Sequence, residues 1–146
     1  VMIFPKFIKL LIFFIPGFLF AQDWMYNFED AKNAASDENK PIILVFSGSD
    51  WCAPCIRLEK EIWNTSDFKD FAKENLVMLK ADFPRRKKNV LSKEQTLHNN
   101  QLAETYNTNG YFPLVVILNS DGDTLGVLGY EKSSPQLYIN KIKALF

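Results

Sequence analysis

The stretch SDWCAPC, residues 49–55, holds the only two cysteines of the 146-residue chain, Cys52 and Cys55. It follows PIILVFS (residues 41–47), a continuous apolar and β-branched run that suits a central strand covered on both faces. After the cysteines, the apolar side chains recur at the spacing of a helix. The pattern therefore predicts a strand, a tight turn and a helix that begins at the cysteine pair.

This placement gives the two cysteines different chemical roles. Unpaired backbone N–H groups and the helix dipole favour negative charge at a helix N-terminus, so the Cys52 thiol loses its proton more readily there. Cys55 lies one turn further on, where its thiol can attack a mixed disulfide formed on Cys52 and release the partner. Pro54 belongs to the first turn, where its missing N–H costs little. The motif thus offers a nucleophile, a resolving thiol and a rigid frame.

Two other uses of a cysteine pair compete with this interpretation. A structural disulfide across so short a loop constrains the unfolded chain little. A structural zinc site normally needs four protein ligands, and the chain has one histidine, His98, which we place on the surface of a distant helix. We therefore expect a redox-active pair and no metal site.

The rest of the chain alternates helices with strands. The pattern predicts a mixed sheet between helices, an α/β domain with no internal repeat or linker. The predicted strands span residues 41–47, 76–83, 114–118 and 125–130. Two of the predicted helices span residues 24–40 and 92–106. Three more begin at the cysteine motif, at Ser66 and at Pro135.

Local signals mark the ends of several elements. Ser66 is expected to cap a short helix, and Ser92 with Gln95 forms a capping-box pattern ahead of another. Asp121-Gly122 predicts a hairpin turn between the last two strands. The residues expected on the core side of the final helix are Leu137, Ile139, Ile142, Leu145 and Phe146.

Residues 1–21 are predicted to be a secretory signal peptide, which leaves a domain over residues 22–146. Two lysines precede an apolar run over residues 10–20, and Ala21 supplies a small residue after which cleavage is expected. An uncleaved membrane anchor is the alternative, although the run is shorter than the about 20 residues of a spanning helix. Export would place the domain in the periplasm or another extracytoplasmic compartment, where a disulfide can persist.

Charge sets limits on the partners of the domain. A formal net charge of zero argues against nucleic acid or an anionic membrane as a partner. The run Arg85-Arg86-Lys87-Lys88 stands out in this neutral chain. A solvated loop is the plainer interpretation of the run, and docking of an acidic partner is the functional one.

These motifs resemble the thioredoxin superfamily over about residues 24–146. Trp51-Cys52-Ala53-Pro54-Cys55 matches its W-C-x-x-C signature, and Phe112-Pro113 matches the position of its cis-proline. Asp121-Gly122 and Gly129 match its last hairpin and the end of its last strand. Within the superfamily, the stretch around the motif is most similar to exported proteins related to the C-terminal domain of the membrane disulfide reductase.

The resemblance implies a thioredoxin fold, with a mixed sheet of four to five strands flanked by helices, and an exported thiol–disulfide oxidoreductase. Cys52 would attack and Cys55 would resolve. A cis Pro113 would face the pair, and the backbone before it would pair with the substrate like an added strand. The implied substrate-binding residues are Trp51, Ala53, Pro54, Phe112 and Pro113.

The same resemblance bears on cofactors and partners. No organic cofactor is implied, because the protein's own dithiol cycles. Client proteins with disulfides or thiols are the implied substrates, and a separate, unidentified redox partner resets the dithiol. By analogy with reductive relatives, we expect clients to be reduced. The alternatives are a non-catalytic module that binds clients through the cis-proline groove and, more weakly, a dithiol that delivers metal.

The sequence departs from the thioredoxin archetype in two places. The archetype has a buried acid in the strand before the motif, where this chain has Phe46. Lys80 and Asp82 alternate onto one face of the next strand, which we interpret as a solvated strand end, so the proton acceptor for Cys55 stays unassigned. A bulky Phe112 is expected to narrow the groove or to add an apolar contact. We also expect Cys52 to be more exposed than Cys55.

Overall fold

The computed structural model describes residues 23–146, so the predicted signal peptide and its cleavage point lie outside the described residues. The strands are β1 (Trp24–Met25), β2 (Ile42–Ser47), β3 (Val77–Asp82), β4 (Leu114–Leu118) and β5 (Thr124–Leu128). The helices are α1 (Phe28–Glu38), α2 (Ala53–Leu58), the π-helix η1 (Glu59–Trp63), α3 (Ser66–Asn75), the 3-10 turn η2 (Lys87–Asn89), α4 (Lys93–Tyr106) and α5 (Pro135–Lys143).

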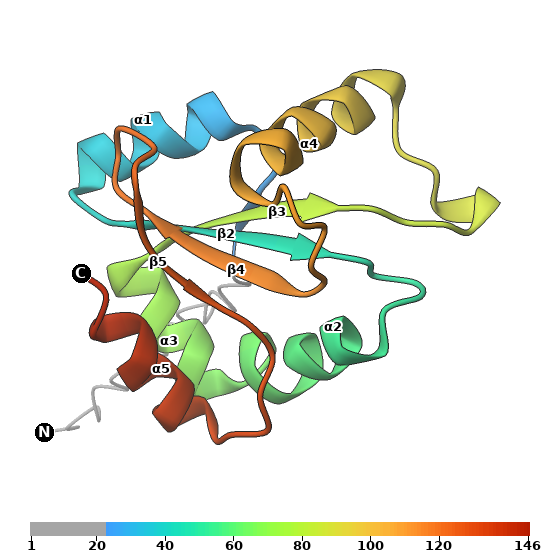
Figure 1. The fold of residues 1–146 in the computed structure, drawn as a ribbon. Coiled ribbons are helices and arrows are strands. Elements are labelled where there is room, and N and C mark those ends of the chain that lie inside the picture. The colour runs from blue at the N-terminus through green and yellow to red at the C-terminus, as the bar shows by residue number, and fades with distance from the viewer. Residues whose placement is uncertain (1–22) are drawn as a thin grey trace, which may run out of the picture.

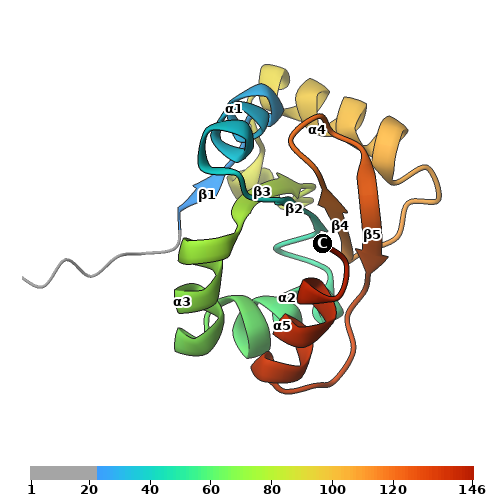
Figure 2. The same ribbon diagram turned by 90° about the vertical axis from the view of Figure 1, so that its left-hand side faces the viewer.

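The five strands form one mixed sheet in the order β1-β3-β2-β4-β5. β1, β3 and β2 run parallel, whereas β4 is antiparallel to both β2 and β5. Helices α1 and α4 cover one face of the sheet, and α2, α3 and α5 cover the other (Figures 1 and 2). The predicted fold class is therefore confirmed, and each of the four predicted strands is present.

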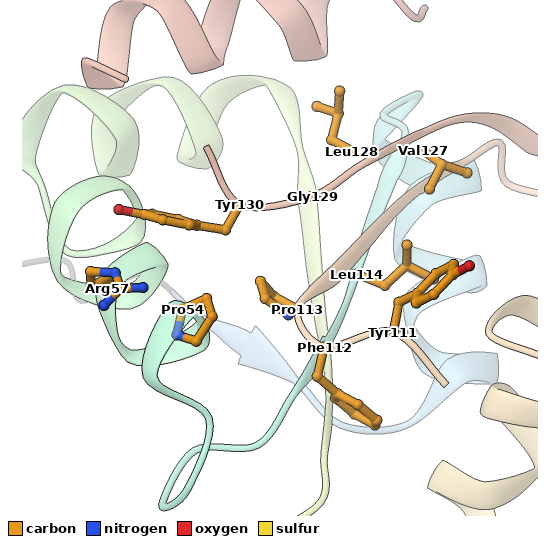
Figure 3. Close-up of a pocket in the computed structure, with 10 residues that line it drawn as sticks. All are labelled: Pro54, Arg57, Tyr111, Phe112, Pro113, Leu114, Val127, Leu128, Gly129 and Tyr130. Atoms are coloured by element: carbon orange, nitrogen blue, oxygen red, sulfur yellow. The ribbon is translucent and has the colours of Figure 1, made fainter. Parts of the chain in front are cut away.

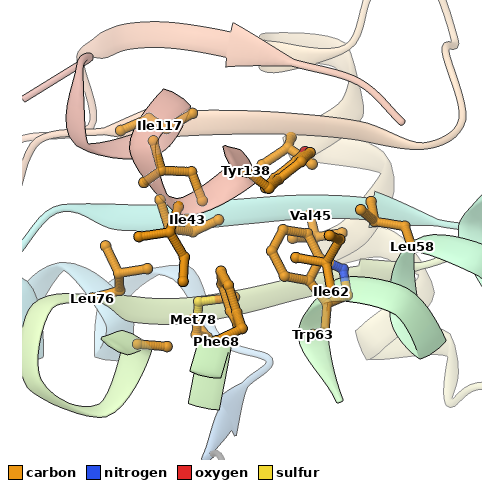
Figure 4. Close-up of a cluster of buried hydrophobic side chains, with 14 residues drawn as sticks. Ile43, Val45, Leu58, Ile62, Trp63, Phe68, Leu76, Met78, Ile117 and Tyr138 are labelled. Atoms are coloured by element: carbon orange, nitrogen blue, oxygen red, sulfur yellow. The ribbon is translucent and has the colours of Figure 1, made fainter. Parts of the chain in front are cut away.

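The central strand β2 is buried on both faces, as its continuous apolar run predicts. Successive side chains of a strand point to opposite faces. Ile43 and Val45 therefore join the core against α3 and α5 (Figure 4), while Ile42, Leu44 and Phe46 join the core against α1 and α4. The strand that precedes the cysteine motif is thus fixed from both sides, which gives the motif a rigid base.

The prediction of a helix over residues 24–40 is wrong at its start. Trp24 belongs to the short strand β1, which extends the sheet beside β3, and its ring packs edge-on to Trp63 at 6.2 Å between centroids. The helix begins at Phe28, because the Asn27 side chain accepts the N–H three residues on and caps it. Pairing with a distant strand decides the conformation of Trp24, and no local signal reveals that pairing.

Two predicted helix caps need correction or completion. Thr65, not Ser66, caps α3, and its hydroxyl accepts the backbone N–H three residues on at 3.3 Å. Ser92 caps α4 as predicted and accepts the Gln95 backbone N–H at 3.1 Å. The Gln95 amide donates to other groups and does not close the reciprocal half of a capping box. The predicted hairpin turn is confirmed, with Gly122 at φ +93°.

The core face of α5 is only partly as predicted. Ile139 and Ile142 are buried and Leu145 packs against the core, but Leu137 is 57% exposed and Phe146 is 51% exposed. Tyr138 takes the buried place instead, packs against Trp63 and donates its hydroxyl to a backbone carbonyl at 3.0 Å. A buried tyrosine is stable where its hydroxyl finds a partner, so the helix turns Tyr138 inward.

Within residues 23–146, no helix combines the length and the apolar character that crossing a membrane requires.

The two faces of α5 allow a matched test of the core. Ile139→Ala removes a side chain that is 3% exposed and should lower the free energy of unfolding by about 2–5 kcal/mol. Leu137→Ala, on the same helix but on the solvent side, should change it by about 0.5 kcal/mol or less. Urea unfolding of both variants measures the difference. Equal losses would contradict this assignment of the helix face.

Candidate active site

The motif and the loop after β3 meet at one edge of the sheet. The two strands are parallel, and the register pairs the last residue of β2, Ser47, with the last residue of β3, Asp82. The two following loops therefore leave the sheet at the same edge (Figure 1). The Asp82 carboxylate accepts the backbone N–H of Ser49 at 2.9 Å and also its hydroxyl. Asp82 is thus a structural anchor for the motif, at a strand end that stays partly exposed as predicted.

Cys52 and Cys55 form a disulfide, so the structure represents the oxidised state. Cys52 caps α2, and its sulfur accepts the Cys55 backbone N–H at 3.3 Å. Each cysteine is only 4% exposed. The expected difference in exposure is therefore wrong for this state, because the bond holds the Cys52 sulfur beside Cys55 at the first turn of α2.

The indole of Trp51 is held by contacts on several sides. Its N–H donates to the Phe83 carbonyl at 2.7 Å, and the Arg85 guanidinium lies 3.6 Å from the ring centroid. The Phe112 ring lies edge-on at 5.5 Å, and it also contacts the Phe83 ring at 5.4 Å. This aromatic cluster (Trp51, Phe83, Phe112) joins the motif to the residue before Pro113. Phe83 is a part of the site that the sequence did not single out, and Arg85, noted there only as one of the four basic residues, packs on the indole.

Gly48 makes room for this indole. A Cβ atom at that position would lie 2.3 Å from the Trp51 ring, well inside any real contact. The close approach of a ring, and not an unusual backbone angle, is therefore what requires glycine in the turn between β2 and α2.

The Phe112-Pro113 peptide bond is cis, as the resemblance implies. Pro113 is buried and shares a pocket of about 500 Å³ with Pro54 (Figure 3). The pocket brings together the start of α2, the turn before β4 and the end of β5. The full lining is Pro54, Arg57, Tyr111, Phe112, Pro113, Leu114, Val127, Leu128, Gly129 and Tyr130. Of the predicted substrate-binding residues, Trp51 and Ala53 do not line it, although Trp51 packs against Phe112.

One wall of this pocket carries a fixed phenol. The Tyr130 hydroxyl donates to the Glu61 carboxylate at 2.9 Å, and the Arg57 guanidinium lies 5.3 Å from the Tyr130 ring. Desolvation raises the pKa of Tyr130 above its usual value, and the bond to Glu61 adds to the effect. Tyr130 therefore stays a neutral hydrogen-bond donor, and Arg57 supplies a positive charge beside the groove.

A second pocket, of about 460 Å³, opens behind Cys55. Glu59 and Lys80 line it together with Cys55, and their side chains form an ion pair at 3.1 Å. The Lys80 side chain is only 16% exposed, so the prediction of a solvated strand end is wrong for Lys80. Glu59 was missed by the sequence analysis. Its position one helical turn after Cys55 is the signal that points to it.

His98 is not the surface residue that the sequence suggests. Its Nε2 accepts the Phe28 backbone N–H at 3.0 Å, which ties α4 to the start of α1. Among residues 23–146, no group of three or more histidine, cysteine or acidic side chains is placed to hold a metal ion.

Asp50 anchors the basic loop after β3 (residues 84–89) to the cysteine motif. Its carboxylate accepts the backbone N–H groups of Arg85 at 2.9 Å and Arg86 at 3.0 Å, and the Asn89 amide at 2.9 Å. These bonds, with Arg85 contributing most, lower the pKa of Asp50 to about 2. The carboxylate is therefore charged at any physiological pH, and it holds the loop two residues before Cys52.

The Asp50 anchor predicts a pH-dependent loop. Because the folded pKa is depressed from 3.8 to about 2, the stabilisation is complete above about pH 4 and is lost as pH falls through 2. Hydrogen-exchange protection of the Arg85 and Arg86 amides should follow this course, with the β4 amides as internal reference. Above about pH 4, Asp50→Ala should lower the protection of these amides severalfold, whereas Asp70→Ala on α3 should not. Protected Arg85 and Arg86 amides in Asp50→Ala would contradict the anchor.

A mixed five-stranded sheet, a C-x-x-C disulfide at a helix N-terminus and a nearby cis-proline define a redox protein with the thioredoxin fold. The thioredoxin-like family matches residues 23–120, and the chain belongs to this family. It is 36% identical over 118 residues to the disulfide bond reductase DsbH of Chlamydia pneumoniae, covering 81% of this chain and 69% of that protein.

Solved structures agree with this assignment. A DsbH oxidoreductase superposes with a TM-score of 0.79 at 32% identity, covering 86% of this chain and 85% of that chain. The oxidised C-terminal domain of Neisseria meningitidis DsbD superposes with a TM-score of 0.56 at 19% identity, covering 80% and 90%, which is a likeness of fold alone. With these relatives and its own Cys52–Cys55 disulfide, this chain is a thiol–disulfide oxidoreductase.

Proposed function

We propose that this protein reduces disulfides in client proteins outside the cytoplasm, with residues 1–21 as its export signal. The observation that carries the proposal is the Cys52–Cys55 disulfide at the start of α2, next to the pocket of Pro113. The direction is supported by a relative 36% identical that is named a disulfide bond reductase.

The reaction balances through the two thiols. In the reduced protein, the Cys52 thiolate attacks one sulfur of a client disulfide, which forms a mixed disulfide and releases one client thiolate. The Cys55 thiolate then attacks the Cys52 sulfur and releases the second client thiolate. The product is the Cys52–Cys55 disulfide seen here. Two electrons and two protons from a separate dithiol partner restore the reduced form, so no organic cofactor takes part.

Client binding is assigned to the pocket beside the cis-proline. Its open lining combines apolar surface from Pro54 and Phe112 with the exposed Tyr111. An extended client segment would pair with the backbone before Pro113, a mode that gives affinity with little side-chain selectivity. Trp51 would act by holding Phe112 in place, and the exposed Ala53 would leave space next to Cys52.

Glu59 is our candidate for the proton acceptor of Cys55. Cys55 must lose its proton before it can resolve the mixed disulfide. Glu59 is the carboxylate that lines the second pocket together with Cys55, and Lys80 holds it by an ion pair. A positioned carboxylate of this kind can act as a general base. The pair would supply the acid that the strand lacks at Phe46.

Two experiments test the function: trapping of a mixed disulfide with a client, and measurement of the reduction potential. Cys55→Ser should accumulate a mixed disulfide between Cys52 and a disulfide-bonded client such as insulin, because the resolving thiol is gone. Cys52→Ser should neither trap nor turn over the client. Gel analysis without reductant measures both. Trapping in neither variant, with client binding retained in Cys52→Ser, would favour a non-catalytic binding module.

The direction is measured by equilibrating the domain with redox buffers. A reductant should show a reduction potential near the ~−270 mV of thioredoxin. A potential near the ~−120 mV of the strongest oxidant of this type would instead make the protein a disulfide donor.

The base assigned to Cys55 predicts a pH-dependent defect. Glu59→Gln keeps the shape but cannot accept a proton, so turnover at pH 7 should fall by about 100-fold, the low end of general-base effects. The defect should shrink as pH rises above about 8.5, where a thiol ionises without help. Steady-state client reduction across pH measures this, with Glu74→Gln on α3 as the control. A defect independent of pH would assign Glu59 a structural role only.

A further inference from the structure

The loop between β3 and α4 carries four consecutive cationic side chains, Arg85 to Lys88, and all four residues are exposed. The protein has no net charge, so this loop concentrates positive charge in one place. That place is not arbitrary. Since parallel β2 and β3 end in register, the loop extends from the same edge of the sheet as the turn before α2 (Figure 1).

The loop is held mainly by its backbone, and its four cationic residues stay exposed. Asp50 accepts the backbone N–H groups of Arg85 and Arg86 and the amide of Asn89. The Arg85 guanidinium packs on Trp51, the residue before Cys52. A merely solvated loop needs no such attachment. Here the attachment fixes a row of cations at a set place relative to the disulfide.

Neighbouring acids compensate the positive charge of the loop only in part. The ion pairs among residues 23–146 involve Lys32, Lys40, Lys80 and Lys141, and none involves a residue of the loop. Asp50 offsets one of the four charges. Lys87 and Lys88 lie in the turn η2, which presents them to solvent for a partner of opposite sign.

We propose that this basic loop (residues 84–89) docks an acidic stretch of the client polypeptide beside the disulfide to be reduced. The inference rests on the proposed function. It adds selectivity to a cis-proline groove that reads mainly backbone. A fixed cationic patch also raises the encounter rate with acidic clients, by tenfold or more at low ionic strength.

The test compares three peptides with the same central disulfide and flanks rich in Glu, Gln or Lys. Their intrinsic reactivity is normalised by reduction with dithiothreitol. For the wild-type chain, the kcat/KM ratio of the Glu peptide to the Gln peptide should be about 10 at low salt and approach 1 at 0.5 M salt. The Lys peptide should be slower than the Gln peptide.

Two charge-reversal variants then locate the effect. Lys87→Glu/Lys88→Glu should bring the Glu-to-Gln ratio to 1 or below. Lys69→Glu/Lys143→Glu makes the same change in net charge on α3 and α5, at the other end of the molecule (Figure 1), and should keep the wild-type ratio. Circular dichroism confirms that both variants are folded.

The outcomes separate the two proposals. If every peptide is reduced but Lys87→Glu/Lys88→Glu leaves the Glu-to-Gln ratio of kcat/KM unchanged, the docking role of the loop is overturned and the proposed function stays intact. Reduction of no peptide by the wild type would overturn both. A third outcome concerns membranes. If the wild type binds vesicles with anionic lipid, Lys87→Glu/Lys88→Glu abolishes that binding, and the Glu-to-Gln peptide ratio is the same in both proteins, the loop binds membranes and the proposal is refuted.

Discussion

The parallel pairing of β2 with β3 is the constraint on which the site depends. Parallel strands in register end at the same edge of a sheet, so whatever follows them is brought together. Ser47 and Asp82 close this pairing, and Asp82 and Asp50 then tie the two loops across the edge. The redox motif therefore rests on a buried strand beneath it and on a second loop beside it.

The aromatic cluster connects this edge to the cis-proline. Trp51 bonds to the backbone of the β3 loop, and Phe112 packs against both Trp51 and Phe83. Three segments far apart in the sequence thus meet around one indole, for which Gly48 leaves space. The bulky residue before Pro113 is accounted for by this packing. Through these ring contacts Phe112 is held beside Pro113, and it also lines the pocket.

The absence of an acid in β2 is accompanied by an ion pair near Cys55, on the opposite face of the sheet from Phe46. Phe46 stacks on Phe83 at 6.4 Å and belongs to the core beneath α1 and α4. Strand alternation turns Lys80, which pairs with Val45, toward α2. Glu59 reaches the same pocket because it follows Cys55 by one helical turn. An acid and a lysine thus stand near the resolving cysteine, but the acid comes from the helix.

The sequence by itself determined the elements and the chemistry that depend on neighbours in the chain. The apolar run of β2, the cysteine spacing, the Ser92 cap and the Asp121-Gly122 turn are local signals, and each proved correct in the structure. These signals depend on hydrogen bonds and on side-chain periodicity between residues that are close in the sequence. The identity of the redox pair follows from the same kind of signal.

Only the tertiary structure decided the features that need two distant segments. Trp24 became a strand because it pairs with β3 at the edge of the sheet. Tyr138 turned inward because its ring packs on Trp63 and its hydroxyl donates to the Gly129 carbonyl. Lys80 is largely shielded from solvent because Glu59 pairs with it, and Asp82 is tied to Ser49 in the turn before the motif. A side chain's partner across the fold depends on topology and register, which a local pattern does not contain. The strand order therefore brings side chains that are far apart in the sequence together around Cys52 and Cys55.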